Sequence, residues 1–169
     1  MMVNHNLIYR RANATDASNI VRLTLSAYHD YKAILASVDW NRMETSLANE
    51  SLFVELLDKA TAFICEIDNQ LAGVIFLVPK GNPTTIFPAD WSYIRLLGVD
   101  PKCRGLGIGR KLTELCVHHA QITGEIGVAL HTSEFMNAAR KMYEELGFKQ
   151  EKELAPIYNK RYWLYKLSF

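Results

Sequence analysis

The stretch IRLLGVDPKCRGLGIGRKL, residues 94–112, decides the fold of this chain. Its first part, up to Val99, is apolar apart from Arg95 and predicts a strand. Pro101 cannot donate to a central ladder, so the strand ends before it. A cluster of glycines follows at 105–109, and an amphipathic pattern then continues to about Thr123. The stretch therefore predicts a strand, a glycine-rich turn and a helix.

The glycine-rich turn has the features of an anion site. Glycines let the backbone approach a ligand closely, and the first N–H groups of the following helix have no partner. The positive end of the helix dipole adds to this, so phosphate is the expected ligand. The spacing does not fit the dinucleotide fingerprint, because Arg110 stands where a glycine is needed. It does not fit the Walker pattern either, and the two mismatches disfavour a nucleotide-binding module. The pattern that does fit is Arg-x-x-Gly-x-Gly over residues 104–109.

Length and composition limit the remaining possibilities. The chain has 169 residues, 49% of them apolar and 22% charged, so one domain over residues 1–169 is expected. A formal net charge of +1 gives no basic excess for nucleic-acid binding. The longest apolar run, 71–79, is too short to span a bilayer, and the N-terminus lacks the apolar core of a signal peptide. We therefore expect a cytoplasmic protein with no nucleic-acid or membrane partner.

The cysteines and histidines do not predict a metal site. Cys65, Cys103 and Cys116 include no Cys-x-x-Cys pair, and three free thiols suit a reducing compartment. His118 and His119 are adjacent rather than one helical turn apart, so they do not form a metal-binding pair. The metal prediction is therefore none.

Hydrophobic periodicity predicts the order βααβββαβαββ, a mixed α/β (α+β) domain with most strands in one sheet. The long loop at 79–90 holds three prolines and a glycine, and loops of this length are often functional. The expected strands are 7–11, 62–68, 71–79, 91–99, 126–132, 147–154 and 161–168, with a tight turn at Asn69-Gln70. The expected helices are about 16–28, 42–58, 108–123 and 136–146.

Two blocks of the chain resemble the GNAT superfamily, the GCN5-related N-acetyltransferases. The first is 94–112, which is similar to the family's acetyl-CoA segment. The second is LHTSEFMNAARKMYEELGF at 130–148, which resembles the following strand and helix and ends in Tyr-x-x-x-Gly-Phe. The resemblance covers roughly 62–168. It implies a single mixed, mostly antiparallel sheet with helices on both faces, and acetyl-CoA as the co-substrate.

The resemblance also implies where the cofactor lies. In the family the fourth strand carries a bulge and parts from the fifth, and the pantetheine arm lies in the gap. A backbone N–H near Leu97 would stabilise the thioester oxyanion. The matching pantetheine positions are Leu97, Gly98 and Val99, and the matching pyrophosphate positions are Arg104, Gly105, Leu106, Gly107, Ile108, Gly109 and Arg110.

One catalytic residue is implied by the resemblance. Tyr143 matches the phenol that acts as an acid toward the departing thiolate, the alternative being a core tyrosine. Many family members carry Asn seven residues earlier, where this chain has Met136, and Asn137 is about 100° further round the helix. The general base is open between Asp90, Glu134 and a water relay.

Some residues near the expected cleft have open roles. Arg95 lies in an apolar strand, so we expect it to be buried in a structural ion pair, with a substrate-carboxylate anchor as the alternative. His131 ends a strand beside the cleft. The aromatic residues that could form the acceptor side are Tyr28, Tyr31, Trp40, Phe87, Trp91, Tyr158 and Tyr162, with core packing as the competing interpretation.

The predicted function is transfer of an acetyl group from acetyl-CoA to a primary amine on a small molecule, by direct attack and without an acyl-enzyme. A small molecule would need a lid, which the loop at 79–90 could supply. The alternatives are a peptide or protein N-acetyltransferase and a non-catalytic domain that senses acyl-CoA. A homodimer is possible, although no sequence feature defines an interface.

Overall fold

Residues 5–169 are described by the computed structural model, and they form seven strands and five α-helices. The strands are β1 (Leu7–Arg11), β2 (Thr61–Ile67), β3 (Gln70–Val78), β4 (Ser92–Val99), β5 (Gly127–Ser133), β6 (Lys149–Glu153) and β7 (Tyr162–Ser168). The α-helices are α1 (Ala17–Tyr28), α2 (Ser37–Leu47), α3 (Glu50–Lys59), α4 (Ile108–Ile122) and α5 (Asn137–Glu145). Short 3₁₀ turns lie at Ala14–Asp16, His29–Ala33 and Pro101–Cys103. None of the helices in this range is both long and apolar enough to cross a membrane.

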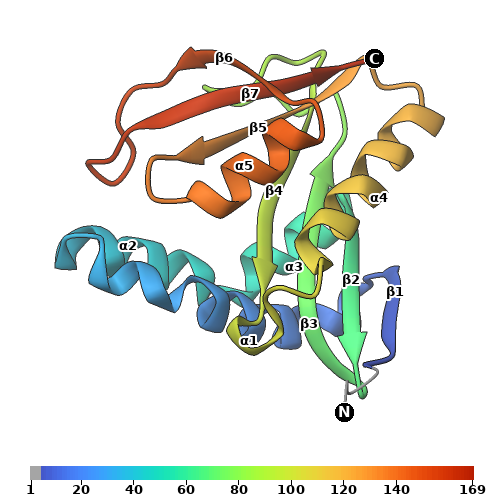
Figure 1. The fold of residues 1–169 in the computed structure, drawn as a ribbon, viewed down its shortest axis with the longest axis vertical. Coiled ribbons are helices and arrows are strands. Elements are labelled where there is room, and N and C mark those ends of the chain that lie inside the picture. The colour runs from blue at the N-terminus through green and yellow to red at the C-terminus, as the bar shows by residue number, and fades with distance from the viewer. Residues whose placement is uncertain (1–4) are drawn as a thin grey trace.

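All seven strands join one sheet in the order β1-β2-β3-β4-β5-β7-β6 (Figure 1). Every neighbouring pair is antiparallel except β4 and β5, which are parallel. The sheet is therefore mixed and mostly antiparallel, which confirms the expected fold class.

Helices cover both faces of the sheet, and each face has its own apolar core. Alternate side chains of a strand point to opposite faces, so Phe76 of β3 packs with Phe53 of α3, while Leu77 belongs to the core on the other face, together with Leu112 of α4. The first core belongs to α1, α2 and α3, and the second to α4 and α5. Strands β4 and β5 lie inside the sheet, with helices on both of its faces (Figure 1).

Two details of the predicted elements are wrong. The expected single helix at 42–58 is two helices, because Asn49 has an extended backbone (φ −82°, ψ 95°) and breaks the first one. The break turns the buried face, so Phe53 and Leu56 are buried in α3 while Val54 is exposed. The turn between β2 and β3 is centred on Asp68-Asn69, one residue earlier than expected, and both residues have positive φ.

The strands β4 and β5 run together for a short distance only. They pair at Ser92↔Val128 and Tyr93↔Ala129 and then separate. Beyond that point β4 carries a bulge, where Leu96 has φ 58° and the pairing with β3 shifts between Val74 and Phe76. The bulge and the parting of the two strands confirm what the family resemblance implied, and they open a space between the halves of the sheet.

Gly73 of β3 sets how closely α4 packs on the sheet. A Cβ atom at this position would lie 2.6 Å from Ile108 Cγ2 and 2.9 Å from Leu112 Cδ1, closer than side chains tolerate. The glycine therefore lets the first turn of α4 lie against β3.

We predict that Gly73→Val lowers the free energy of unfolding by about 1–3 kcal/mol, because it overpacks this contact. Urea denaturation measures the change. Gln150→Val in exposed β6 is the control and should change stability by less than about 0.5 kcal/mol. Equal stability of the two variants would show that α4 can move away without cost.

Candidate active site

A groove of about 570 Å³ runs from the end of α1, past the end of β4, to the starts of α4 and α5. Its lining includes nine of the ten residues expected to hold the cofactor. Leu106 is the exception, since its side chain is exposed and does not line the groove. The nine are Leu97, Gly98, Val99, Arg104, Gly105, Gly107, Ile108, Gly109 and Arg110.

The glycine turn in this groove has the geometry of an anion site. Gly105 and Gly107 have φ 83° and 77°, values that favour glycine, and no atom lies within 4 Å of where their Cβ atoms would be. The first intrahelical bond of α4 runs from Lys111 N to Gly107 O at 3.0 Å. The N–H groups of residues 108–110 therefore have no partner inside the helix and can bind a phosphate.

Two arginines of the turn make ion pairs with neighbouring elements. The Arg104 guanidinium donates to Asp30 Oδ2 at 2.7 Å and to the Ala27 carbonyl at 3.0 Å, which ties the turn to the end of α1. Arg110 pairs with Glu145 at the end of α5. These contacts hold the glycine turn between α1 and α5, while both arginines still line the groove.

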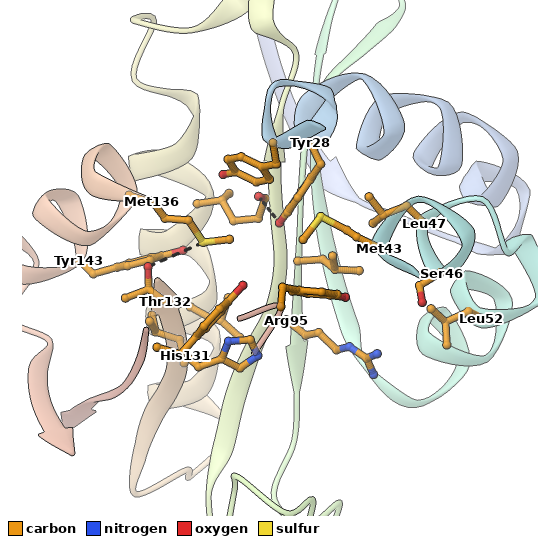
Figure 2. A pocket seen from close by; sticks show the side chains of 18 residues that line it. Tyr28, Met43, Ser46, Leu47, Leu52, Arg95, His131, Thr132, Met136 and Tyr143 are labelled. Carbon is orange, nitrogen blue, oxygen red and sulfur yellow. Dashed lines mark hydrogen bonds between the residues drawn. The ribbon is translucent and has the colours of Figure 1, made fainter. Parts of the chain in front are cut away.

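A second cavity of about 270 Å³ lies between β4 and β5, beneath α2 and α5. We call it the acceptor cavity. Figure 2 shows its side chains converging from both halves of the sheet. It meets the groove at residues that line both spaces, namely Tyr28, Tyr31, Leu97, Met136 and Ala139.

Tyr143 projects from α5 into the acceptor cavity (Figure 2). Only 6% of the residue is exposed, and no hydrogen bond within residues 5–169 occupies its hydroxyl. Burial is the largest cause that raises the pKa of Tyr143 above its usual value of 10. The phenol therefore keeps its proton at neutral pH and is free to donate it.

The bulge of β4 is held by a tyrosine. The Tyr28 hydroxyl donates a hydrogen bond to the Leu97 carbonyl at 3.0 Å, where the groove and the acceptor cavity meet. Met136 lies just before α5 and lines both spaces, with its sulfur 3.9 Å from Thr132 Oγ1. Asn137 lines the groove but not the acceptor cavity.

The two carboxylates considered as the general base lie elsewhere. Neither Asp90 nor Glu134 lines the groove or the acceptor cavity, and Glu134 accepts a hydrogen bond from Arg161 N at 3.1 Å. His131 does line the acceptor cavity. Burial, followed by the charge of Arg95, lowers the pKa of His131 to about 4, so its imidazole is neutral at pH 7.

The expectation of a buried, paired Arg95 is wrong. The side chain is exposed and lines the acceptor cavity, and its guanidinium makes no ion pair within residues 5–169. The cause is the parting of β4 from β5, which uncovers a strand that the apolar sequence pattern had indicated as covered on both faces.

The aromatic candidates divide into lining and core residues. Tyr28, Tyr31, Tyr158 and Tyr162 line the acceptor cavity. Trp40 and Phe87 are buried in the core, and Trp91 lies under the Lys166 ammonium at 3.9 Å. No residue of the loop at 79–90 lines either space, and a lid formed by this loop stays a prediction.

The outer wall of the acceptor cavity comes from segments without a local motif. Ser46 and Leu52, on either side of the break between α2 and α3, line it opposite Tyr158 of the β6–β7 loop. Asn159 Nδ2 donates to the buried carboxylate of Asp39 at 2.9 Å and ties that loop to α2. Sequence analysis named Tyr158 as a candidate for the acceptor side, but it gave no signal for Ser46 or Leu52, because their position in the wall depends on tertiary packing.

The three cysteines are all free thiols. Cys103 lines the groove, while Cys65 and Cys116 are buried. Burial raises the pKa of the Cys116 thiol, which keeps it neutral. Within residues 5–169 no group of three or more metal-binding side chains is found.

Known proteins are similar to this chain in sequence. A model of the acetyltransferase (GNAT) family matches residues 25–148. Mycothiol acetyltransferase from Thermomonospora curvata is 35% identical over 91 residues, which cover 54% of this chain and 28% of that protein. N-acetylaspartate synthetase from Danio rerio is 25% identical over 123 residues, which cover 73% of this chain and 41% of that protein.

Solved structures agree with the fold. The PaiA N-acetyltransferase from Thermoplasma acidophilum, determined in complex with coenzyme A, superposes with a TM-score of 0.77 over 96% of this chain and 99% of that one, at 13% identity. The curated relatives are matched over less than half of their own length. Because the family model spans more than half of this chain, the protein belongs to the acetyltransferase (GNAT) family.

Proposed function

We propose that this protein transfers an acetyl group from acetyl-CoA to a primary amine on a small molecule. The observation that carries the proposal is the junction of two spaces at Leu97 and Tyr28. One space has an anion site at a helix start, and the other holds a free phenol, so a thioester at the junction would lie between them.

Acetyl-CoA fits the groove in both shape and charge. The pyrophosphate would bind the unpaired N–H groups at the start of α4, where the open positions of Gly105 and Gly107 leave room for it. The pantetheine arm would pass Val99 and Gly98 on β4 to reach Leu97. The thioester would then lie beside the bulge, where a strand-four N–H stabilises its oxygen as negative charge develops.

The reaction follows from these positions. The lone pair of the neutral amine attacks the thioester carbonyl carbon, a C–N bond forms and the C–S bond breaks. The nitrogen, positively charged after the attack, releases one proton to solvent and becomes the amide nitrogen. The sulfur leaves as a thiolate and takes a proton from the Tyr143 hydroxyl, which regains one from solvent. No side chain forms a covalent intermediate, in keeping with the buried, neutral Cys116.

The amine must lose a proton before it attacks, because an alkylammonium with a pKa near 10 has no free lone pair. The lining of the acceptor cavity contains no Asp or Glu. His131 is neutral, and a pKa of about 4 makes it a weak proton acceptor. A relay of water molecules to solvent is therefore the route that we propose.

A small acceptor agrees with the dimensions of the site. A cavity of about 270 Å³ is just below the usual size of ligand pockets, and the α2–α3 junction and Tyr158 form part of its lining. Two curated relatives have names that refer to acetylation of small molecules, mycothiol and aspartate.

We predict that Gly107→Glu weakens binding of acetyl-CoA at least about 100-fold, because it places a carboxylate at the pyrophosphate position and strains a left-handed residue. Isothermal titration calorimetry measures the affinity, with ATP as the ligand control. Gly81→Glu carries the same charge on a glycine with φ 91°, outside both spaces, and should bind acetyl-CoA as the wild type does. Unchanged binding by Gly107→Glu would place the cofactor elsewhere.

We predict that Tyr143→Phe lowers kcat about 100-fold and leaves the affinity for acetyl-CoA within about twofold, because it removes only the proton donor. Release of CoA in the presence of amines measures turnover. Tyr165→Phe is the matched control, since that hydroxyl donates to Glu144 at 2.7 Å outside the cavity. A domain that only senses acyl-CoA would bind it and show no turnover to lose.

We also predict that Asp90→Asn and Glu134→Gln each keep kcat/KM within about twofold, because neither carboxylate reaches the acceptor cavity, whereas removing a general base costs about 100-fold or more. Steady-state kinetics with the best amine measures both variants. A tenfold or larger loss in one of them would identify that carboxylate as the base.

A further inference from the structure

The acceptor cavity contains one permanently charged side chain, the guanidinium of Arg95, and no carboxylate lines it. Arg95 pairs with Phe76 across the sheet and comes directly before the bulge residue Leu96. It is therefore two residues from Leu97, where the thioester would lie. In Figure 2 the Arg95 side chain extends from β4 toward the side of the cavity where Leu52 lies, while His131 lies on the other side of that strand.

Arg95 is the arginine that lines the acceptor cavity, and no ion pair within residues 5–169 holds it. Arg10, Arg104, Arg110 and Arg161 each pair with a carboxylate. Arg95 has no such partner within residues 5–169, although it lies in a concave space walled by apolar and aromatic side chains. The guanidinium is exposed and therefore hydrated in the free protein, and its planar fork matches the carboxylate of a molecule that enters the cavity.

The other side chains that line the acceptor cavity do not neutralise the charge of Arg95. The imidazole of His131 carries no charge at neutral pH. It can form a hydrogen bond with a bound acceptor, but it does not offer a second positive charge to a carboxylate. Ser46 contributes a hydroxyl to the same lining, and the remaining walls are largely tyrosine, leucine and methionine. These walls suit an apolar side chain, whereas a second cationic group, as in a polyamine, would meet the positive charge of Arg95 without a carboxylate to balance it.

We propose that Arg95 binds a carboxylate of the acceptor, so that the acceptor is a small amine that also carries a carboxylate, such as an amino acid with an apolar side chain. This inference rests on the proposed acetyl transfer and names its substrate class. Arg95 then acts as a specificity residue that holds the acceptor by its acid group and directs the amine toward the thioester at Leu97.

The test compares acceptors that differ only in the carboxylate. The probes are L-leucine, L-leucinamide and 3-methylbutylamine, the matching set built on L-phenylalanine, and spermidine. Each kcat/KM is referred to the concentration of unprotonated amine, because the three forms differ in amine pKa. The wild type should prefer the carboxylate form about 10- to 100-fold over its amide, the range of a charge-assisted hydrogen-bonded pair.

The variants assign that preference to one side chain. Arg95→Gln should bring the ratio of acid to amide close to one, and Arg95→Lys should keep part of it. Arg22→Gln is the control, because Arg22 is exposed on α1 and lines neither space. Thermal melting confirms folding, and titration with acetyl-CoA should give the same affinity for all four proteins.

Binding separates this inference from the proposed function. L-leucine and L-leucinamide are titrated into the protein saturated with CoA, which needs no turnover. Binding of the acid that Arg95→Gln abolishes supports the carboxylate site even if no amine is acetylated, an outcome that would overturn only the acetyl transfer. Turnover that is equal for acid and amide, or a preference that survives in Arg95→Gln, overturns the inference, as does the absence of both binding and turnover across the panel.

Discussion

The short parallel pairing of β4 and β5 is the constraint on which the site depends. After two residue pairs the strands separate. Three residues beyond the last pair, Leu96 takes a left-handed conformation that costs about 1 kcal/mol or more for a residue with a side chain. Pairs with β3 on both sides, at Arg95 and Gly98, hold the bulge in place. In a regular strand alternate side chains face opposite sides, yet Ile94 through Leu97 all line the acceptor cavity. The irregular strand therefore makes both the opening and its lining.

The two spaces recognise their ligands by different physical means. The groove presents backbone N–H groups and a helix dipole, so its positive potential comes from chain geometry and needs no free cationic side chain. Its arginines at 104 and 110 are already paired with acids. The acceptor cavity relies on side chains instead, with hydroxyls, an imidazole and a guanidinium among apolar walls. Among these groups the imidazole of His131 is buried, whereas the guanidinium of Arg95 is exposed to solvent.

Sequence patterns predicted the cofactor side well because its requirements are local. Glycines at 105 and 107 have the positive φ that their position in the turn suggested, and the apolar spacing of 108–123 matches α4. The strand order and the helices on both faces agreed with the family resemblance. The same periodicity failed at Asn49, because apolar residues continue at helical spacing across a break that only the backbone reveals.

The acceptor side was predicted less well for a physical reason. The environment of Arg95 depends on how far two strands separate, and residue types in one strand do not encode that distance. Ser46, Leu52 and Tyr158 belong to unremarkable segments that meet only when the sheet is complete. Sequence reasoning could point to tyrosines as candidates, but it could not separate Tyr158, which faces the cavity, from Trp40, which is in the core.

The hydrogen bond between Asn159 and Asp39 joins positions that are 120 residues apart in the chain. It connects the loop that carries Tyr158 to the helix that carries the opposite wall, so the shape of the acceptor cavity is set by a contact outside the cofactor groove. Substitutions in these two segments can therefore remodel the pocket while the glycine turn and α4 stay unchanged. The same fold can in this way keep its acetyl-CoA site and come to accept a different amine, with the sequence changes confined to α2 and the β6–β7 loop.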